Sequence, residues 1–546
     1  MRNIHLRYVS EKYDKNGILT DFKMTCPEDF NFAYDVVDDI AINDPNRRAL
    51  VWCDAHGNEK TMTFGDMKRY SDKTSNYFLS KGIGKGDSVL LILKNNPHFW
   101  YVLVALHKIG AIGIPATFML KKHDIEYRIN AASIKAVVSI STDGIIEEVD
   151  SAENIPTLEC KMIVGGTRDG WDDLDKGVEK ASDKLARAET KITDPLLIYF
   201  SSGTTGYPKM VMHDHSYTIG HILTAKHWHQ VDPDGLHFTV ADTGWAKAAW
   251  GKLYGQWFME AGVFVYDFDK FIPDDVLRIV SKYKVTTLCC PPTMFRMFLN
   301  DGNVKSHELS CLKNTTIAGE ALNPDVFAKW YDATGLKLME GFGQTETTVT
   351  VCNIRGMEPR PGSMGKPSPQ YVVDIIDHDG KSCPAGVTGE IVVRTDPPVA
   401  GMMIGYYRDP EKTAATVYDG WHHTGDMAWR DEDGYIWYVG RNDDIIKSSG
   451  YRIGPFEIES VLAHHPAVKE CAVTGVPDDV RGQLVKATIV LREGHEPSDA
   501  LKKDIQEFVK RETAPYKYPR VVEFVGMLPK TISGKIRRVE IRDRDG

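Results

Sequence analysis

Strand-like apolar runs alternate with helix-like segments through most of this sequence. The run 88–93 precedes an amphipathic segment at 99–108, and the run 285–290 precedes two prolines and a helix-like segment at 293–299. This alternation is typical of parallel sheets covered by helices, in which ligands bind beyond the carboxyl ends of the strands. The sequence therefore predicts an α/β fold.

The composition is that of a globular protein of 546 residues, 42% of them hydrophobic and 26% charged. A chain of this length is too long for a single core, so we expect more than one domain. The 76 acidic residues outnumber the 66 basic ones, which argues against a nucleic-acid or membrane-surface partner. The most hydrophobic stretch, 99–120, is interrupted by His107, Lys108 and Pro115, so it predicts a buried helix and strand and no membrane span.

The nine cysteines are scattered and include no Cys-x-x-Cys pair. Their odd number and irregular spacing indicate a reducing compartment and no structural zinc. We therefore expect a cytoplasmic protein. The histidine pairs 213/215 and 422/423 are assigned to packing or hydrogen bonding, and no metal is assigned to them.

The sequence pattern changes after residue 440. A polar stretch, Arg-Asn-Asp-Asp at 441–444, is followed by helix-like segments and strand-like runs at 455–463, 468–474, 485–491, 498–511 and 521–525. About a hundred residues with apolar stripes of their own are enough for a small domain. The sequence predicts a large N-terminal domain, residues 1–442, and a small α+β C-terminal domain, residues 443–546.

A loop rich in hydroxyl groups and glycine follows the apolar run 198–200. It consists of Ser201, Ser202, Gly203, Thr204, Thr205, Gly206, Tyr207, Pro208 and Lys209. Its glycines let backbone N–H groups converge on anionic oxygens, its four hydroxyls add donors, and its lysine adds a positive charge. It is not the common P-loop, because no Gly-Lys pair in the chain has a glycine five residues earlier. The loop predicts a polyphosphate site of another kind.

Three further segments carry groups suited to nucleotide chemistry, although each is weak evidence alone. Glu346 beside Thr345, on a glycine-containing loop, suits Mg²⁺ and phosphate. Asp426, in a Thr-Gly-Asp turn, suits the two hydroxyls of a ribose. The basic tail at 529–538 contains Lys535, but such a run is most often a solvated terminus.

Together, these motifs resemble the adenylate-forming superfamily of acyl-CoA synthetases, peptide-synthetase adenylation domains and luciferases. The resemblance covers nearly the whole chain, in order and spacing, through Thr-Thr-Gly-Tyr-Pro-Lys (204–209), Phe-Gly-Gln-Thr-Glu (342–346), Thr-Gly-Asp (424–426), Gly-Arg-Asn-Asp-Asp (440–444) and Gly-Lys (534–535). Segments 242–245, 341–347 and 449–454 most resemble medium-chain acyl-CoA synthetases. The resemblance implies α/β subdomains with a distorted β-barrel in the large domain and a mobile small domain.

The resemblance implies a two-step reaction. A carboxylate and ATP give an acyl-adenylate and pyrophosphate, and the acyl group then passes to the thiol of CoA. The loop 201–209 is expected to hold the β- and γ-phosphates, Thr345 to bond the α-phosphate and Glu346 to bind Mg²⁺. The remaining ATP and AMP contacts implied by the resemblance are Gly319, Glu320, Ala321, Glu340, Gly341, Phe342, Asp426 and Arg441.

The resemblance places the catalytic lysine of the first step at Lys535, in the small domain. Another face of that domain carries the CoA-side loop of Ser449, Gly450, Tyr451 and Arg452, so the resemblance implies that the domain rotates between the steps, with Asp443 as hinge. Gly450 is expected to line the thiol tunnel, where a side chain would obstruct pantetheine. Acetylation of Lys535 is expected to block only the first step.

The acyl pocket is expected to involve Trp245, Lys247, Trp250, Cys290 and Gly343. Acetate-specific relatives carry tryptophan at the position of Gly343, so glycine is expected to leave space for a larger acid. The two tryptophans bound that space, which favours short-to-medium, branched or aryl acids. Lys247 pairs either with a polar group of the substrate or, as we favour, with a neighbouring acidic residue.

Two other functions stay open. A stand-alone ligase that loads a carrier-protein thiol would share the first step, although no carrier domain is appended to this chain. A nucleotide sensor without catalysis is disfavoured, because Lys535, Glu346 and Asp426 are all present. The identity of the acid, the contacts of the CoA nucleotide and a homo-oligomeric state are left undecided.

Overall fold

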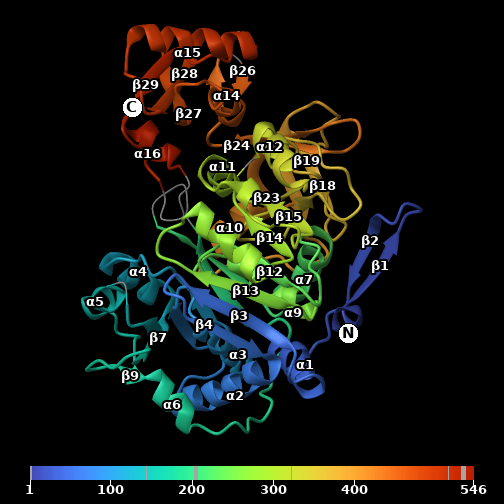
Figure 1. Ribbon diagram of the computed structural model, residues 1–546, viewed down its shortest axis with the longest axis vertical. Helices are drawn as coiled ribbons and strands as arrows, with labels where there is room; N and C mark the ends of the chain where they lie inside the picture. Colours follow the sequence, from blue (N-terminus) through green and yellow to red (C-terminus); the bar gives the residue numbers. More distant parts are fainter. Residues whose placement is uncertain are drawn as a thin grey trace. The chain divides into compact units, whose positions relative to one another are not determined.

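The computed structural model describes residues 3–142, 144–201, 207–320, 322–449, 451–514, 516–530 and 536–545 (Figure 1). The chain forms two compact units. The large unit comprises residues 1–361, 365–372 and 394–420, and the small unit comprises residues 362–364, 373–393 and 421–546. The fold is α/β with a large N-terminal and a small C-terminal part, as predicted. The domain boundary at residue 442 stays a prediction.

The first sheet of the large unit has the strand order β21-β11-β10-β6-β5-β7-β8-β9. Its strands are β5 (Ser88–Ile92), β6 (Ile112–Pro115), β7 (Ile134–Ile140), β8 (Cys160–Val164), β9 (Asp172–Asp173), β10 (Pro195–Ser201), β11 (Lys209–Asp214) and β21 (Gly405–Tyr406). All neighbours from β10 to β9 are parallel, whereas β11 is antiparallel to both β10 and β21.

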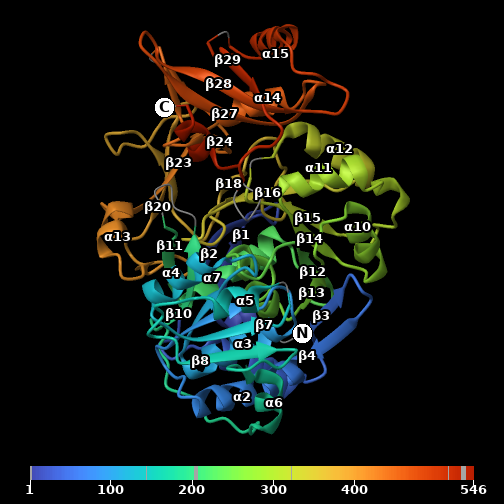
Figure 2. The same ribbon diagram turned by 90° about the vertical axis from the view of Figure 1, so that its left-hand side faces the viewer.

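Helices flank this sheet, namely α2 (Phe64–Ser80), α3 (His98–Ile109), α4 (Lys122–Ala132), α5 (Ile145–Asp150) and α6 (Leu174–Lys180). Helix α3 is buried from Phe99 to Ile109, and β6 is buried throughout, which confirms the predicted buried helix and strand. Helices α2 and α6 contact each other (Figure 2). Among the described residues, no helix combines the length and apolar character that a membrane crossing requires.

The second sheet of the large unit has the order β18-β17-β16-β15-β14-β12-β13-β3-β4. Its strands are β3 (Arg48–Asp54), β4 (Glu59–Thr63), β12 (Leu236–Thr239), β13 (Gly262–Asp267), β14 (Thr287–Cys290), β15 (Asn314–Ile317), β16 (Leu338–Phe342), β17 (Val351–Cys352) and β18 (Lys366–Pro367). The strands from β3 to β16 are parallel, so the ends of β15 and β16 meet at one edge.

The other elements of the large unit connect and cover these sheets. They are η1 (Ile4–Arg7), β1 (Val9–Tyr13), β2 (Leu19–Met24), η2 (Ala33–Asp38), α1 (Asp39–Asn43), α7 (Ser216–Leu223), η3 (Thr224–Trp228), α8 (Lys247–Gly251), α9 (Tyr254–Phe258), α10 (Pro273–Lys282), α11 (Pro292–Asp301), η4 (Val304–Ser306), α12 (Pro324–Thr334), α13 (Pro410–Thr416) and β22 (Val417–Tyr418). Proline at the start of α10, α11, α12 and α13 suits the first turn of a helix, where its missing N–H is not needed.

The small unit contains two sets of strands. One set consists of β19 (Val373–Ile376), β20 (Gly389–Arg394), β23 (Trp421–Arg430) and β24 (Ile436–Arg441), in which β19 is antiparallel to β20 and β23 is antiparallel to β24. The distorted β-barrel that the resemblance implies for the large domain stays a prediction. The second set is β25 (Ile446–Ser448), β26 (Tyr451–Ile453), β27 (Val468–Asp478), β28 (Gly482–Leu491) and β29 (Val521–Phe524), with helices α14 (Pro455–Leu462), α15 (Asp499–Glu512) and α16 (Arg538–Asp543).

The predicted elements of the C-terminal segment are confirmed to within a few residues. Helix α15 begins after Ser498, whose hydroxyl accepts a hydrogen bond from the backbone N–H of Leu501. Helices α14 and α15 contact each other, and α14 also contacts β27 (Figure 1). The apolar side chains of these elements form a core of their own, which includes Ile458, Val473 and Val509.

Candidate functional site

The predicted phosphate loop connects β10 to β11 as a hairpin. Ser201 and Lys209 are paired across the two strands. The ring of Tyr127 stacks on that of Tyr207, with 4.3 Å between their centroids, and its hydroxyl donates to the carbonyl of Pro208 at 3.1 Å. Strand pairing therefore holds Ser201 and Lys209 at the two ends of the loop, and Tyr127 holds the segment at Tyr207 and Pro208. The predicted ligands Ser202, Gly203, Thr204, Thr205 and Gly206 lie outside the described residues.

Lys209 and Glu346 come together around the phenol of Tyr406. The Lys209 ammonium donates to the Tyr406 hydroxyl oxygen at 3.4 Å and lies 5.1 Å from the centre of its ring. The same hydroxyl donates to Glu346 Oε1 at 2.8 Å. Both Tyr406 and Glu346 are buried, 4% and 7% exposed. A cation and a carboxylate predicted from separate motifs thus share one neighbour, which the sequence analysis missed.

The backbone of Thr345, the residue before Glu346, is held by His213. The imidazole Nε2 lies 2.8 Å from the backbone carbonyl of Thr345 and donates to it, because a carbonyl can only accept. Burial lowers the pKa of His213 to about 4, so its ring is neutral at pH 7, with the proton on Nε2. The ring of Tyr217 stacks on it at 3.7 Å. The prediction that His213 serves in hydrogen bonding and packing is confirmed.

The predicted adenine contacts lie at the ends of the neighbouring parallel strands β15 and β16. Gly319 follows β15 with φ +102°, in the left-handed region that favours glycine, and no atom lies within 4 Å of the position a Cβ would take. Glu340 lies on β16, and its Oε1 accepts from the backbone N–H of Leu322 at 3.3 Å. This hydrogen bond ties the segment after β15 to β16. Ala321 lies outside the described residues.

The carboxyl group of Glu340 is buried, only 3% exposed. Desolvation raises its pKa to about 8, and the hydrogen bond from Leu322 opposes that rise. Its neighbour Gly341 is closely packed, because a Cβ there would lie 2.6 Å from the indole of Trp228. The carboxyl group of Glu320, in contrast, accepts from the hydroxyl of Thr293 at 2.7 Å.

Asp426 and Arg441 are cross-strand partners in the β23–β24 hairpin of the small unit. Asp426, 4% exposed, accepts from Arg441 Nη1 at 3.3 Å and from the hydroxyl of Tyr438 at 3.2 Å. Arg441 also donates to the carbonyl of Thr424 at 2.7 Å, and its Nε lies 3.5 Å from Asp443 Oδ1. The cluster fixes a carboxylate in place, and Tyr438 is a member that the sequence analysis missed.

The structure describes the predicted CoA-side loop and the catalytic tail only in part. Gly450, Lys535 and the side chain of Arg452 lie outside what is described, so their roles stay predictions. Ser449 has φ +50°, and its hydroxyl accepts from Arg481 at 3.4 Å. The ring of Tyr451 stacks on that of Tyr516, with 4.0 Å between the centroids.

The structure corrects one expectation for the acyl pocket and leaves another untested. A Cβ on Gly343 would lie 2.5 Å from the ring of Trp250 and 2.4 Å from the carbonyl oxygen of Thr348. Glycine at this position therefore allows the indole of Trp250 to pack closely against it, and the size of the acid that the pocket accepts stays a prediction. Lys247 donates to the carbonyl of Ala318 at 2.9 Å. Among the described residues it has no carboxylate partner, so the favoured ion pair is wrong.

Two other predicted pocket residues differ in their exposure. Cys290 is fully buried, and burial raises the pKa of its thiol well above the ordinary value. A thiol in this state is a poor nucleophile, and the expected place of Cys290 in the acyl pocket stays a prediction. Trp245 is half-buried, in the turn that follows Asp242.

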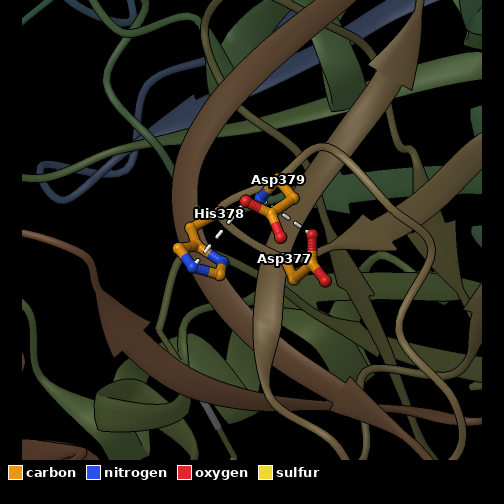
Figure 3. A group of neighbouring side chains, drawn as sticks. All are labelled: Asp377, His378 and Asp379. Atoms are coloured by element: carbon orange, nitrogen blue, oxygen red, sulfur yellow. Dashed lines mark hydrogen bonds and ion pairs between the residues drawn. The ribbon is translucent and has the colours of Figure 1, made fainter.

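One group of side chains has the spacing of a metal site, namely Asp377, His378 and Asp379 in the turn that follows β19 (Figure 3). Asp377 Oδ1 accepts from the backbone N–H groups of Asp379 and Lys381, both at 2.9 Å, so its geometry is that of an ordinary turn. His378 and Asp379 are exposed. We assign no metal to this turn.

Comparisons with known proteins agree with this arrangement of motifs. A family model described as AMP-binding enzyme matches residues 37–407, and one described as AMP-binding enzyme C-terminal domain matches residues 457–535. The mitochondrial acyl-coenzyme A synthetase ACSM3 of Homo sapiens is 41% identical over 538 residues, 96% of this chain and 91% of that protein. The mitochondrial acyl-coenzyme A synthetase ACSM5 of Homo sapiens is 42% identical over 532 residues, with 95% and 91% covered.

A solved structure is similar along almost the whole chain. The crystal structure of the anthranilate CoA ligase AuaEII in complex with anthranoyl-AMP has a TM-score of 0.87 and 30% sequence identity. The similarity covers 95% of this chain and 98% of that one.

Proposed function

The chain belongs to the AMP-binding enzyme family, and we propose that it is an AMP-forming acyl-CoA synthetase for a short-to-medium-chain, branched or aryl carboxylic acid. The observation that carries the proposal is the cluster of Lys209, Tyr406 and Glu346, which brings a cation and a carboxylate together at the mouth of the phosphate loop. Such a pair suits ATP phosphates and the cation that accompanies them.

The residues present fit a magnesium ion. Glu346 is a buried carboxylate whose Oε1 is held by one hydrogen bond, and Mg²⁺ prefers oxygen ligands, commonly one or two carboxylates together with substrate phosphates. We propose that Glu346 holds the ion. When bound, Mg²⁺ neutralises charge on the phosphates of ATP and makes pyrophosphate a better leaving group.

The protein groups then act by position and charge. Lys209 supplies a point charge to the β- and γ-phosphates, and Thr345, fixed by His213 through its carbonyl, bonds the α-phosphate. Asp426 accepts hydrogen bonds from the ribose hydroxyls. Lys535 bridges the substrate carboxylate and the α-phosphate as the acyl–phosphate bond forms. A thiol does not displace oxide from a carboxylate, but it displaces AMP from the acyl-adenylate, which is why two steps are needed.

We propose that the small domain rotates between the two steps, with Asp443 as the hinge and Gly450 beside the thiol. Acetylation of Lys535 is proposed to stop only the first step.

A cytoplasmic location is supported by nine free thiols. The two human relatives are named as mitochondrial, so cell fractionation has to decide the location.

The choice of acid follows from the pocket. Trp250, which packs beside Gly343, bounds the space proposed for the acid. The similar anthranilate CoA ligase is named for an aryl acid. The alternative, a ligase that loads a carrier protein, is less favoured because the relatives are named acyl-coenzyme A synthetases.

The test is pyrophosphate release over acids from acetate to palmitate, including branched and aryl acids, with and without CoA. We expect turnover that depends on CoA and is highest for a mid-sized acid. Lys535→Ala is expected to lower adenylation by about 10²–10³-fold and to spare thioester formation from preformed acyl-adenylate. Lys530→Ala, whose lysine pairs with Glu470, is the matched control. Turnover that ignores CoA would favour another acceptor.

A further inference from the structure

We propose that Tyr406 is a positioning residue that keeps Lys209 and Glu346 apart and correctly placed for the phosphates of ATP and their cation. This inference rests on the proposed function and deepens it. It concerns a residue that none of the sequence motifs used above contains. Its basis is the contact of one phenol with two charged groups.

The phenol contacts both charges through its single oxygen. It accepts from the Lys209 ammonium at 3.4 Å and donates to Glu346 Oε1 at 2.8 Å. A hydroxyl can do both at once, since it has one proton to give and lone pairs to accept with. Hydrogen bonds in such a chain polarise one another, so the ammonium strengthens the bond that the phenol gives to the carboxylate.

A direct ion pair would make a poor resting state for this site. If Lys209 bonded Glu346 itself, the phosphate and the cation would each have to break that pair before binding. In the structure the two charged groups are joined through the phenol, which contacts both of them. A neutral spacer of this kind positions the ammonium and the carboxylate through one oxygen, without a charge of its own.

The fold fixes the phenol from several directions. Strand β21 is paired with β11, the strand that begins at Lys209, with Tyr406 opposite Val211. The backbone N–H of Tyr406 donates to the hydroxyl of Thr413 at 2.9 Å. Close by in sequence, the N–H of Met403 donates to the backbone carbonyl of Glu346 at 2.8 Å. The segment 403–406 therefore holds both the backbone and the side chain of Glu346.

The test compares Tyr406→Phe with Tyr407→Phe, which makes the same change at the next residue, a half-buried tyrosine outside the site. Tyr406→Phe keeps the ring beneath Lys209 and removes only the hydroxyl. We expect acyl-adenylate formation to fall by about 10- to 100-fold, the range for losing a hydrogen bond to a charged group. For Tyr406→Phe, thioester formation from preformed acyl-adenylate is expected to stay within about twofold of wild type. For Tyr407→Phe, both adenylate formation and thioester formation are expected to stay within about twofold of wild type.

A second readout does not depend on turnover. Binding of Mn²⁺, in place of Mg²⁺, to the protein with a non-hydrolysable ATP analogue can be followed by electron paramagnetic resonance. We expect Tyr406→Phe to weaken this binding by about tenfold and Tyr407→Phe to leave it unchanged. Tyr406→Phe with wild-type adenylation and wild-type Mn²⁺ affinity would overturn the inference.

The outcomes separate this inference from the proposed function. If the wild-type protein forms no acyl-adenylate with any acid, the proposed function fails, while the Mn²⁺ assay still tests Tyr406. If Tyr406→Phe does not fold, Thr413→Val removes the hydroxyl that holds the Tyr406 backbone and leaves the phenol intact. A smaller loss in both assays then supports the inference, and wild-type values overturn it.

Discussion

Two clusters, one in each unit, each combine predicted site residues with a tyrosine that the sequence analysis missed, and they are built in different ways. Asp426, Tyr438 and Arg441 belong to one hairpin and are at most 15 residues apart in sequence. Lys209, Glu346 and Tyr406 are brought together across as many as 197 residues. The first cluster needs only the register of two adjacent strands, whereas the second needs both sheets of the large unit and the return of the chain at β21.

The difference predicts how each cluster responds to mutation. In the hairpin cluster, Arg441 keeps the Thr424 carbonyl as a partner when the Asp426 contact is lost. In the large unit, the site residues also belong to close packing between distant segments, as at Gly343 and Trp250. Substitutions in the hairpin should therefore affect chemistry more than folding, and substitutions in the large unit should affect both.

The largest effect is expected for Asp426→Asn. The amide keeps the size of the side chain but loses the charge proposed to accept the ribose hydroxyls, so adenylation should fall by about 10²–10³-fold. The free energy of unfolding should fall by about 1–3 kcal/mol without loss of folding, because a charge-assisted hydrogen bond is weakened while Arg441 remains bonded to Thr424. Asp433→Asn, in the exposed turn of the same hairpin, is the control. Loss of folding in Asp426→Asn would break the comparison.

An intermediate effect is expected for Gly343→Ala. The added methyl group meets the Trp250 ring and the Thr348 carbonyl, so the free energy of unfolding should fall by about 1–3 kcal/mol. Urea unfolding measures this. Gly84→Ala is the control, because no atom lies within 4 Å of the position of its Cβ. A double variant with Trp250→Ala should lose less than the sum of the two single changes, and strict additivity would contradict the contact.

The most gradual effect, spread over several pH units, is expected in the pH dependence of Glu340→Gln. The pKa of Glu340 is raised from 4.5 to about 8, so between these values the folded protein holds a proton that the unfolded chain has released. This carboxyl group therefore makes the wild-type protein less stable as pH rises from about 4.5 to 8, by at most about 1.4 kcal/mol per pH unit. Glutamine keeps the acceptor for Leu322 and removes that slope.

The control for this measurement is Glu493→Gln, whose carboxylate is exposed. Urea unfolding at pH 6, 7 and 8 should show the gap between Glu340→Gln and wild type widening with pH. The gap for Glu493→Gln should stay constant. A constant gap for Glu340→Gln would mean that its carboxyl group is ionised in the folded state throughout this range.

The sequence predicts those features that repeat locally. The helix expected at 455–463 is α14, and the one expected at 498–511 is α15, because periodic apolar positions and the Ser498 cap are local signals. Lys209, Glu346 and Asp426 carry motifs that stand out in the sequence. Their contacts with ligands are still untested.

What the sequence could not provide depends on tertiary pairing. Tyr406 meets Glu346 across 60 residues, and His213 meets Thr345 across 132 residues, so no spacing rule links them. The close packing of Gly343 against Trp250 has the same origin, because Trp250 belongs to α8 and Gly343 follows β16. Tyr438 was missed because the register of β23 and β24, including its shift after Met427, is not visible in the sequence.

The spacing of two site residues on β11 limits how the sequence of this protein can change in evolution. Lys209 and His213 are four residues apart, so they lie on the same face of the strand, about 13 Å from each other along it. One reaches Tyr406 and the other reaches the Thr345 carbonyl. An insertion or deletion of one residue between them would turn one of the two to the opposite face. Selection is therefore expected to remove insertions and deletions within 209–213, even at positions there where substitutions are tolerated.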